Sequence, residues 1–432
     1  MKNILIISYF FPPCNLTASQ RVLGWANYLS NFGYYPTIVS RNWDIPINSP
    51  EDVLKSTGRE FVHQKNDQYE VYYLPYVASI RDQIFSKNKD KKIFQKISKI
   101  LTFKDQILEN YFNRSIPFSN LYDFSLDLIQ KEDKYKCLIV SGNPFVQFKF
   151  GFLLNKKTGI RWIADYRDDW NTSELISRGN GLKKIISSLQ SKSERKWVKS
   201  SECIISVSPK YTSKIASFVN KNGEVILNGF DGLNENDIIE TDKRYFTITY
   251  NGSLYPTQPI EIVINAIKKI ILNKDVTLKI QLNFPGLGFD KTQKNRVEKA
   301  IKGIESNVLI TDRILKEDVV KIQKGSDLLL MVSHLNIKGI PSSKMYEYIG
   351  LKKQILFYPN DHDIVEQTLK STGLGVICNN EKEVYLNLLN LILLKQNENS
   401  VFNLSKIDQI EFYSRKNQTA ILAQLIDRII EI

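Results

Sequence analysis

Short apolar runs rich in β-branched residues alternate with amphipathic stretches along this chain of 432 residues. Such alternation predicts a parallel sheet covered by helices on both faces. The stretch 19–31, for example, predicts a helix that carries its apolar side chains on one face. In the first half of the chain the predicted strands are 3–8, 36–40, 70–74, 137–141, 161–165, 203–207 and 224–227.

A turn-rich patch at 228–232 and a polar stretch at 234–243 interrupt this rhythm, which then begins again. We therefore predict an N-terminal domain over 1–232, a second domain over 233–407, and one long amphipathic helix over 408–432. In the second domain the predicted strands are 246–250, 277–283, 308–311, 328–332, 354–358 and 375–378, and the predicted helices are 261–272, 291–301, 316–323, 343–350, 364–372 and 381–394.

The pattern thus indicates the α/β class, with two Rossmann-like domains. Sheets of this type place ligands at the carboxyl ends of their strands, where the strand order reverses. A cleft between the two domains is therefore the expected site.

Charge and cysteine usage narrow the possible partners and the compartment. The formal net charge of +13 favours polyanionic partners, such as nucleotide phosphates, anionic lipid headgroups or nucleic acid. No nucleic-acid-binding motif is present, so we expect no nucleic-acid partner. The four cysteines are far apart, which argues against zinc and disulfides and fits a reducing cytosol. No apolar run is long enough for a membrane span or a signal peptide, so a cytoplasmic protein is expected.

The loop after the first predicted strand, about ten residues, is longer than a plain βα link needs. Arg21 falls in the first turn of the following helix, where a positive charge is unfavourable against the helix dipole. We therefore expect Arg21 to serve an anion or a buried carboxylate; the alternative is an arginine on the surface.

Three carboxylates and an arginine follow the apolar strand 161–165 at its carboxyl end, where such sheets hold their chemistry. An aspartate beside an arginine can fix a polar substrate, or one aspartate can act as a base. We predict Asp165, Arg167 and Asp168 as catalytic residues. The alternative is an ion-pair network that closes the end of the strand.

A third motif begins the predicted helix 343–350. Free N–H groups at the first turn of this helix, next to Ser342, can hold phosphate oxygens, and Lys344 would add a point charge. Glu347 lies one turn further, where its carboxylate could accept two hydrogen bonds from a vicinal diol such as a ribose. The alternative is an ordinary helix with a cap, a carboxylate near its N-terminus and a solvated lysine.

These landmarks span nearly the whole chain: Phe11-Pro12-Pro13 with Arg21, Asp165-Tyr166-Arg167-Asp168-Asp169-Trp170, Ser206-Val207-Ser208, Asn228-Gly229-Phe230-Asp231, Tyr250-Asn251-Gly252-Ser253-Leu254-Tyr255 and Ser343-Lys344-Met345-Tyr346-Glu347-Tyr348. In this order the set resembles the retaining glycosyltransferases of the GT-B fold, family 4, in the subgroup with a Phe-Pro-Pro first loop and a Ser-Lys-x-x-Glu-Tyr donor motif.

The resemblance implies transfer of a sugar, with retention, from a nucleotide diphosphate to a glycan or lipid-linked acceptor in surface polysaccharide biosynthesis. It implies that Glu347 holds the donor ribose and that the terminal helix crosses back onto the first domain. The remaining donor residues would be Gly252, Ser253, Ser342, Ser343 and Lys344, and the loop that approaches the transferring sugar would contribute Pro13, Asn15 and Arg21.

Three departures from the family pattern bear on the donor site. Gly339 stands eight positions before Glu347, where many members have a second glutamate. Ser253 stands where many have an arginine, and Gln258-Pro259 stands where many have a lysine. They leave Lys344 and helix N-termini as the phosphate contacts. They also support an alternative function, a non-catalytic binding subunit. A sugar-nucleotide epimerase shares the architecture, but the Ser-Lys-x-x-Glu-Tyr motif and the scarcity of histidines speak against it.

No Asp-x-Asp motif of the metal-dependent sugar transferases is present, so we expect metal-independent transfer and no cofactor beyond the nucleotide-sugar substrate. The segment 87–101 is basic, with Ile93, Ile97, Ile100 and Leu101 on one helical face. Such a helix can lie in an anionic membrane surface, which would make the protein peripheral at the inner face of the membrane. The alternative is a helix packed on the first sheet with a solvated lysine face.

Overall fold

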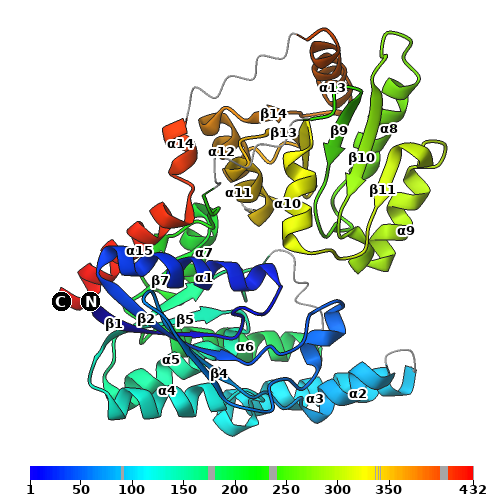
Figure 1. The fold of residues 1–432 in the computed structure, drawn as a ribbon. Helices are drawn as coiled ribbons and strands as arrows, with labels where there is room; N and C mark the ends of the chain where they lie inside the picture. The colour runs from blue at the N-terminus through cyan, green and yellow to red at the C-terminus, as the bar shows by residue number, and fades with distance from the viewer. Residues whose placement is uncertain are drawn as a thin grey trace. The chain divides into compact units, whose positions relative to one another are not determined.

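The computed structural model divides the chain into two compact units. Unit 1 comprises Met1–Asn228 with Arg415–Ile432, and unit 2 comprises Gly229–Ser414. Each unit has its own sheet (Figure 1). The structure describes residues 1–88, 92–173, 181–232, 241–335, 337–338, 340, 342–398 and 407–431.

The sheet of unit 1 has the strand order β3-β4-β2-β1-β5-β6-β7-β8, and every pair is parallel except β3 with β4. Its central strands are buried because helices cover both faces. The strands are β1 (Lys2–Ser8), β2 (Tyr34–Arg41), β3 (Val62–Lys65), β4 (Glu70–Leu74), β5 (Tyr135–Gly142), β6 (Trp162–Tyr166), β7 (Cys203–Ser206) and β8 (Gly223–Val225).

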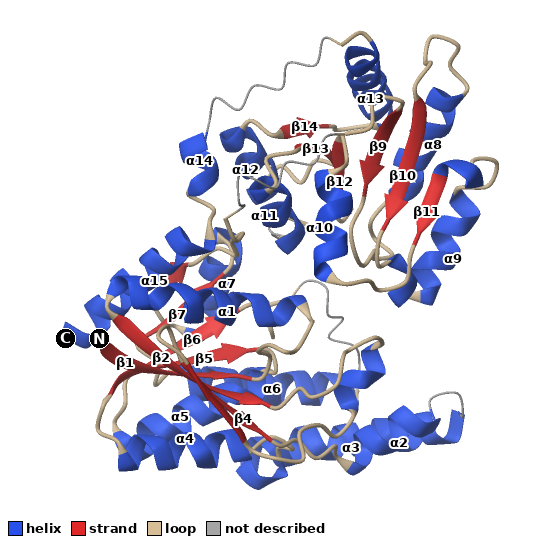
Figure 2. Cartoon of the chain, viewed as in Figure 1, coloured by secondary structure: helices blue, strands red, loops and turns tan. Residues whose placement is uncertain are grey.

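The helices of unit 1 lie on both faces of this sheet (Figure 2). Helices α1 and α15 pack against each other over one face, whereas α4 and α5 lie on the other. The bounds are α1 (Gln20–Tyr28), α2 (Ile80–Asn88), α3 (Lys92–Tyr111), α4 (Asn120–Lys131), α5 (Phe148–Thr158), α6 (Leu182–Val198), α7 (Pro209–Val219) and α15 (Arg415–Glu431).

The C-terminal helix α15 is part of unit 1, as the predicted crossover helix requires. Leu422 and Ile426 are fully buried in the core of the first sheet. The Gln418 side chain accepts a hydrogen bond of 2.9 Å from the backbone N–H of Leu227. Gly24 on α1 admits this helix, since a Cβ there would lie 2.8 Å from Arg415 Cδ.

The sheet of unit 2 has the order β11-β10-β9-β12-β13-β14 and is parallel throughout. Its strands are β9 (Tyr245–Thr249), β10 (Lys279–Phe284), β11 (Val308–Ile310), β12 (Leu328–Val332), β13 (Gln354–Tyr358) and β14 (Gly375–Ile377). Its helices are α8 (Ile260–Ile271), α9 (Lys291–Ala300), α10 (Lys316–Lys324), α11 (Ser343–Gly350), α12 (Ile364–Thr372), α13 (Glu381–Gln396) and α14 (Ile407–Glu411).

All thirteen strands predicted from the sequence are present, with bounds shifted by a few residues. The prediction of one helix over 408–432 is wrong. The chain breaks into α14 and α15 because Tyr413 turns inward, where its backbone oxygen accepts a 3.2 Å hydrogen bond from Phe230 and its ring packs near Tyr346. No helix among the described residues has the length and apolar character of a membrane span.

Candidate functional site

The carboxyl end of β6 carries the predicted carboxylates of unit 1, and the first of them is buried. Asp165 has no exposed surface, and one of its carboxylate oxygens accepts a 3.0 Å hydrogen bond from Arg21 Nε. Ser141 Oγ donates to the other oxygen at 2.7 Å. Arg21 also donates to the backbone oxygen of Ile226 at 2.8 Å and lies over the Trp25 ring.

Arg21 therefore serves a buried carboxylate, one of the two roles expected for it. The pair joins α1, β5, β6 and the segment after β8 inside unit 1. With both oxygens of Asp165 occupied and none of its surface exposed, this geometry fits an internal ion pair better than a group that touches substrate. The catalytic role of Asp165 stays a prediction that the burial disfavours.

Arg167 and Asp168, which follow β6, are placed differently. The Arg167 guanidinium lies 5.4 Å from the ring centre of Phe10, and its Nη2 is 3.8 Å from Asp168. The side chain of Arg167 is 15% exposed, whereas that of Asp168 is 62% exposed. Burial lowers the pKa of Arg167, and the Asp168 carboxylate opposes that shift. Both side chains thus lie at the carboxyl edge of the sheet, with Asp168 accessible.

A buried glutamate holds the loop that follows β6. Glu194 on α6 has no exposed surface and accepts hydrogen bonds from Tyr166 at 2.9 Å and Asn171 at 2.5 Å. Burial raises the pKa of Glu194 to about 7, against the effect of both hydrogen bonds. Burial likewise raises the pKa of Asp169. No local sequence pattern indicated Glu194, because its partners are more than twenty residues away.

The side chain of Asn15 joins the first loop of unit 1 to the segment after β2 that contains Ile47. The Asn15 amide accepts a 3.2 Å hydrogen bond from the Ile47 backbone N–H and donates to the Ile47 oxygen at 3.3 Å. Pro13 is exposed on the same loop. Phe10 stacks on Trp43, with ring centres 5.4 Å apart. The loop is therefore fixed by its neighbours and leaves Pro13 at the surface.

In unit 2 the candidate donor residues converge at the carboxyl ends of β9 and β12. Lys344, on the first turn of α11, donates hydrogen bonds to the Tyr250 hydroxyl at 2.9 Å and the Ser253 backbone oxygen at 2.7 Å. Its ammonium also lies 4.1 Å from the centre of the Tyr250 ring. Burial lowers the pKa of Lys344 to about 7, although the Glu347 carboxylate favours the charged form. The structure thus brings Lys344 into contact with Ser253 and Tyr250, which precede it in the sequence by 91 and 94 positions.

Gly252 lies beside this lysine in a left-handed conformation with φ +78°. A Cβ at Gly252 would be 3.5 Å from Lys344 Cε, which is an ordinary contact distance, so it is the left-handed turn that favours glycine here. Its N–H donates to the Pro285 oxygen at 2.9 Å. The loop after β9 is thereby held against the loop after β10.

The remaining donor candidates lie on or next to α11. Ser342 is the N-cap residue, and its side chain makes no capping hydrogen bond. Ser343 is the first residue of the helix, where backbone N–H groups have no intrahelical partner. Glu347 follows one turn later and is half-buried. Gly339 lies outside the described residues, so the structure leaves that departure untested.

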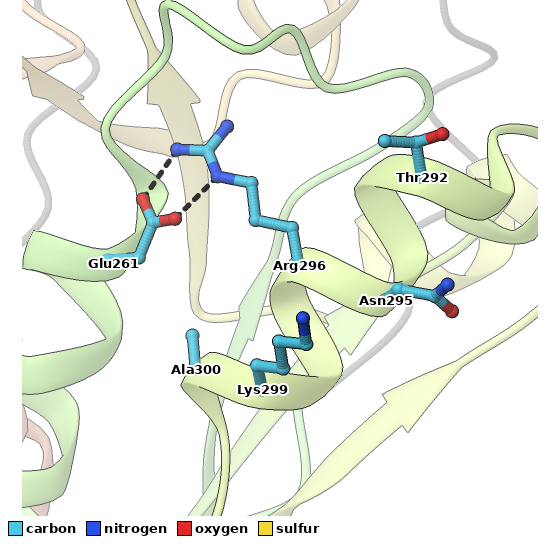
Figure 3. Close-up of a pocket in the computed structure, with 6 residues that line it drawn as sticks. All are labelled: Glu261, Thr292, Asn295, Arg296, Lys299 and Ala300. Atoms are coloured by element: carbon cyan, nitrogen blue, oxygen red, sulfur yellow. Dashed lines mark hydrogen bonds and ion pairs between the residues drawn. The ribbon is translucent and has the colours of Figure 1, made fainter.

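An arginine that the sequence did not indicate anchors the loop after β9. Arg296 on α9 forms a two-pronged ion pair with Glu261 at 2.5 Å and donates to the backbone oxygen of Gln258 at 2.7 Å. In Figure 3 the two carboxylate oxygens of Glu261 face this guanidinium. Gln258 continues the network inward, since its amide donates to the Val332 oxygen at 2.6 Å. Arg296 and Lys344 therefore hold the same loop after β9, Arg296 at Gln258 and Lys344 at Ser253.

The open pocket drawn in Figure 3 is formed by residues of α8 and α9, and none of the candidate donor residues lines it. It is lined by Glu261, Thr292, Asn295, Arg296, Lys299 and Ala300. Arg296 and Glu261 in this pocket are already paired with each other. We therefore assign them to holding the loop after β9 rather than to binding substrate.

His334, in the loop after β12, also faces the donor candidates. It shares a 2.6 Å hydrogen bond with the Thr257 hydroxyl. Burial lowers the pKa of His334, and the nearby Lys344 ammonium adds to this effect. Among the described residues, no group of three or more histidine, cysteine, aspartate or glutamate side chains could hold a metal ion.

Comparison with known proteins gives matches in structure. No protein-family model matches the chain, and neither does any curated protein sequence. Sucrose-phosphate synthase from Thermosynechococcus elongatus superimposes over 100% of both chains with a TM-score of 0.65 and 9% identity. A glycosyltransferase from Rickettsia africae covers 100% of this chain and 99% of its own, with a TM-score of 0.59 and 13% identity.

The Anabaena protein HepE, solved with UDP and glucose, covers 99% of this chain and 100% of its own, with a TM-score of 0.58 and 10% identity. At such identities the likeness establishes the fold. The chain has the GT-B fold, in which two α/β units with parallel sheets follow one another and the terminal helix returns to the first.

Proposed function

We propose that the chain is a retaining, metal-independent glycosyltransferase of the family 4 type that moves a hexose from a nucleotide diphosphate to a glycan or lipid-linked acceptor, in the synthesis of a surface polysaccharide. The observation that carries the proposal is the convergence of Lys344, Gly252 and Ser253 at the N-terminus of α11, within a GT-B fold.

The donor diphosphate would bind at this convergence. An ammonium has three N–H donors, and among the described residues two of those of Lys344 have partners, which leaves one for a phosphate oxygen. The N–H groups at the start of α11 and the positive end of its dipole would add to the same anion. These groups would stabilise the negative charge that grows on the leaving diphosphate.

Glu347 fits the role of ribose ligand, since it lies one turn from Lys344 and is half-buried. On unit 1, the exposed carboxylate of Asp168 fits a contact with the acceptor or the transferring sugar, and Arg167 would hold that aspartate in place. HepE has been solved with UDP and glucose, which supports a nucleotide-sugar donor as the ligand class here.

A thermal-shift panel of nucleoside diphosphates tests the donor site. A ligand at 100 times its Kd adds about 2.7 kcal/mol to the free energy of unfolding. We expect at least one nucleoside diphosphate to stabilise the protein, Lys344→Met to abolish that shift, and the exposed Lys382→Met to leave it unchanged. Stabilisation that is equal in parent and Lys344→Met would refute the assignment of the site.

Product analysis separates the proposed transferase from its alternatives. A transferase releases nucleoside diphosphate only with an acceptor or by slow hydrolysis, an epimerase converts the sugar nucleotide without acceptor, and a binding subunit leaves it unchanged. Binding without turnover over a panel of glycan and lipid-linked acceptors would favour the binding subunit, which the serine at position 253 already supports.

A further inference from the structure

The N-terminal half of α3 exposes a row of isoleucines. Ile93 is 65%, Ile97 38% and Ile100 68% exposed, and their spacing of four and three residues places them on one helical face. Single exposed apolar side chains are ordinary, but a contiguous row on one helix marks an interaction surface. Leu101, expected beside them, is only partly exposed.

Lysines border this row. Lys96, Lys99 and Lys104 are all exposed, and the segment 92–104 contains four lysines and no aspartate or glutamate. Lys104 extends the isoleucine row by one turn, while the other two lysines lie beside it. Aliphatic side chains flanked by lysines suit a boundary between hydrocarbon and anionic headgroups, because the lysine stems lie along the apolar layer while the ammonium groups reach the charge.

The packing of α3 on its neighbours anchors this face to unit 1. Helix α3 packs against α2 and α6. Near its C-terminal end, the Lys149 ammonium donates to the Glu109 backbone oxygen at 2.6 Å. Val77, just before α2, and Ile80, the first residue of α2, are also exposed, at 70% and 73%. The isoleucine face is therefore presented on a supported helix.

We propose that the α3 face formed by Ile93, Ile97 and Ile100 with Lys96, Lys99 and Lys104 docks on an anionic membrane surface. This inference stands independently of the reaction proposed for the chain. A symmetric pairing of two copies through this face fits less well, since it would bring the lysines of one copy against those of the other.

Co-sedimentation of the full chain with phosphatidylcholine vesicles, with and without phosphatidylglycerol, tests the proposal. Binding should require phosphatidylglycerol and weaken at high salt, because the Debye length falls from about 10 Å at 0.1 M to about 3 Å at 1 M. Each lysine near such a surface contributes about fivefold to partitioning, so Lys96→Glu with Lys99→Glu should weaken binding by about 25-fold or more.

A charge-matched control is needed because the whole chain carries a charge of +13. Lys299→Glu with Lys302→Glu removes two exposed lysines at the same spacing in unit 2 and should change binding only slightly. For the apolar row, the triple variant I93S/I97S/I100S should lose vesicle binding. Leu272→Ser, at a position 83% exposed, should keep it.

Three results would overturn the proposal. The first is equal loss of binding in the α3 pair and the control pair, which would indicate attraction by net charge alone. The second is a sign that the isoleucines contribute nothing to binding. Either unchanged vesicle binding by the triple isoleucine variant or equal binding of the parent to a soluble polyanion would show this. The third is a parent dimer in light scattering that the triple variant abolishes, which would make the face a contact between copies.

Discussion

Replacement of Arg21 by methionine tests whether the pair with Asp165 is structural. The variant leaves the Asp165 carboxylate with no exposed surface and with the Ser141 hydroxyl as its remaining hydrogen-bond donor among those described. Removing one partner of a buried ion pair costs about 3–5 kcal/mol, because the other charge stays buried and unpaired. That is a large part of a total stability of about 5–15 kcal/mol.

Urea unfolding followed by tryptophan fluorescence measures this loss in the correct unit. All five tryptophans, Trp25, Trp43, Trp162, Trp170 and Trp197, belong to unit 1. The double variant R21M/D165L should recover much of the loss, because an apolar pair replaces two buried charges. Arg428→Met is the matched control. Its ion pair with Glu224 also lies in unit 1, but both side chains are exposed, so the cost should be about 1 kcal/mol or less.

A loss below about 1 kcal/mol for Arg21→Met would refute this reasoning, since a buried charge left without its partner costs more than that. A normal stability together with a loss of sugar transfer would instead assign the pair to catalysis, as the sequence suggested for Asp165.

Two further substitutions separate functional from structural roles. Asp168→Asn should lower turnover at least tenfold, as measured by steady-state kinetics. In urea unfolding it should change the free energy of unfolding by less than about 0.5 kcal/mol, because the side chain is 62% exposed. A loss of stability with retained turnover would contradict this. Glu347→Ala should weaken nucleoside diphosphate binding about tenfold through the loss of charged hydrogen bonds to a ribose, as measured by calorimetry. An unchanged affinity for the nucleoside diphosphate would exclude a ribose contact.

Much of the fold could be predicted because most strands, and the helices of unit 2, carry their own local signal. Buried strands such as β12 and β13 are continuous apolar runs, and α11 and α12 have the predicted bounds. Strand β3 was missed, since its sequence is short and mostly polar and it lies at an antiparallel sheet edge.

The candidate site was predicted less completely, because its contacts join distant parts of the chain. Lys344 was expected near a phosphate, but its hydrogen bonds to Tyr250 and Ser253 follow from the fold rather than from any local pattern. The same holds for Arg296 and Glu194, which support the loops after β9 and β6 from helices elsewhere in sequence.

Calorimetric titration with UDP, with ADP and GDP beside it, between pH 7 and 9 tests the central claim that Lys344 holds the donor diphosphate. Burial lowers the pKa of Lys344 to about 7, so above this pH the lysine of the free protein is mostly neutral. An anionic diphosphate favours the ammonium, so binding should take up a proton. The affinity should then fall by up to tenfold per pH unit as the pH rises.

Titrations in buffers of different ionisation enthalpy count the protons taken up. Lys344→Arg, which stays charged over this range, should bind without proton uptake and with an affinity that changes little with pH. The account predicts uptake approaching one proton at pH 8 in the parent and none in the variant. Binding without uptake in the parent, or the same pH dependence in both proteins, would contradict it.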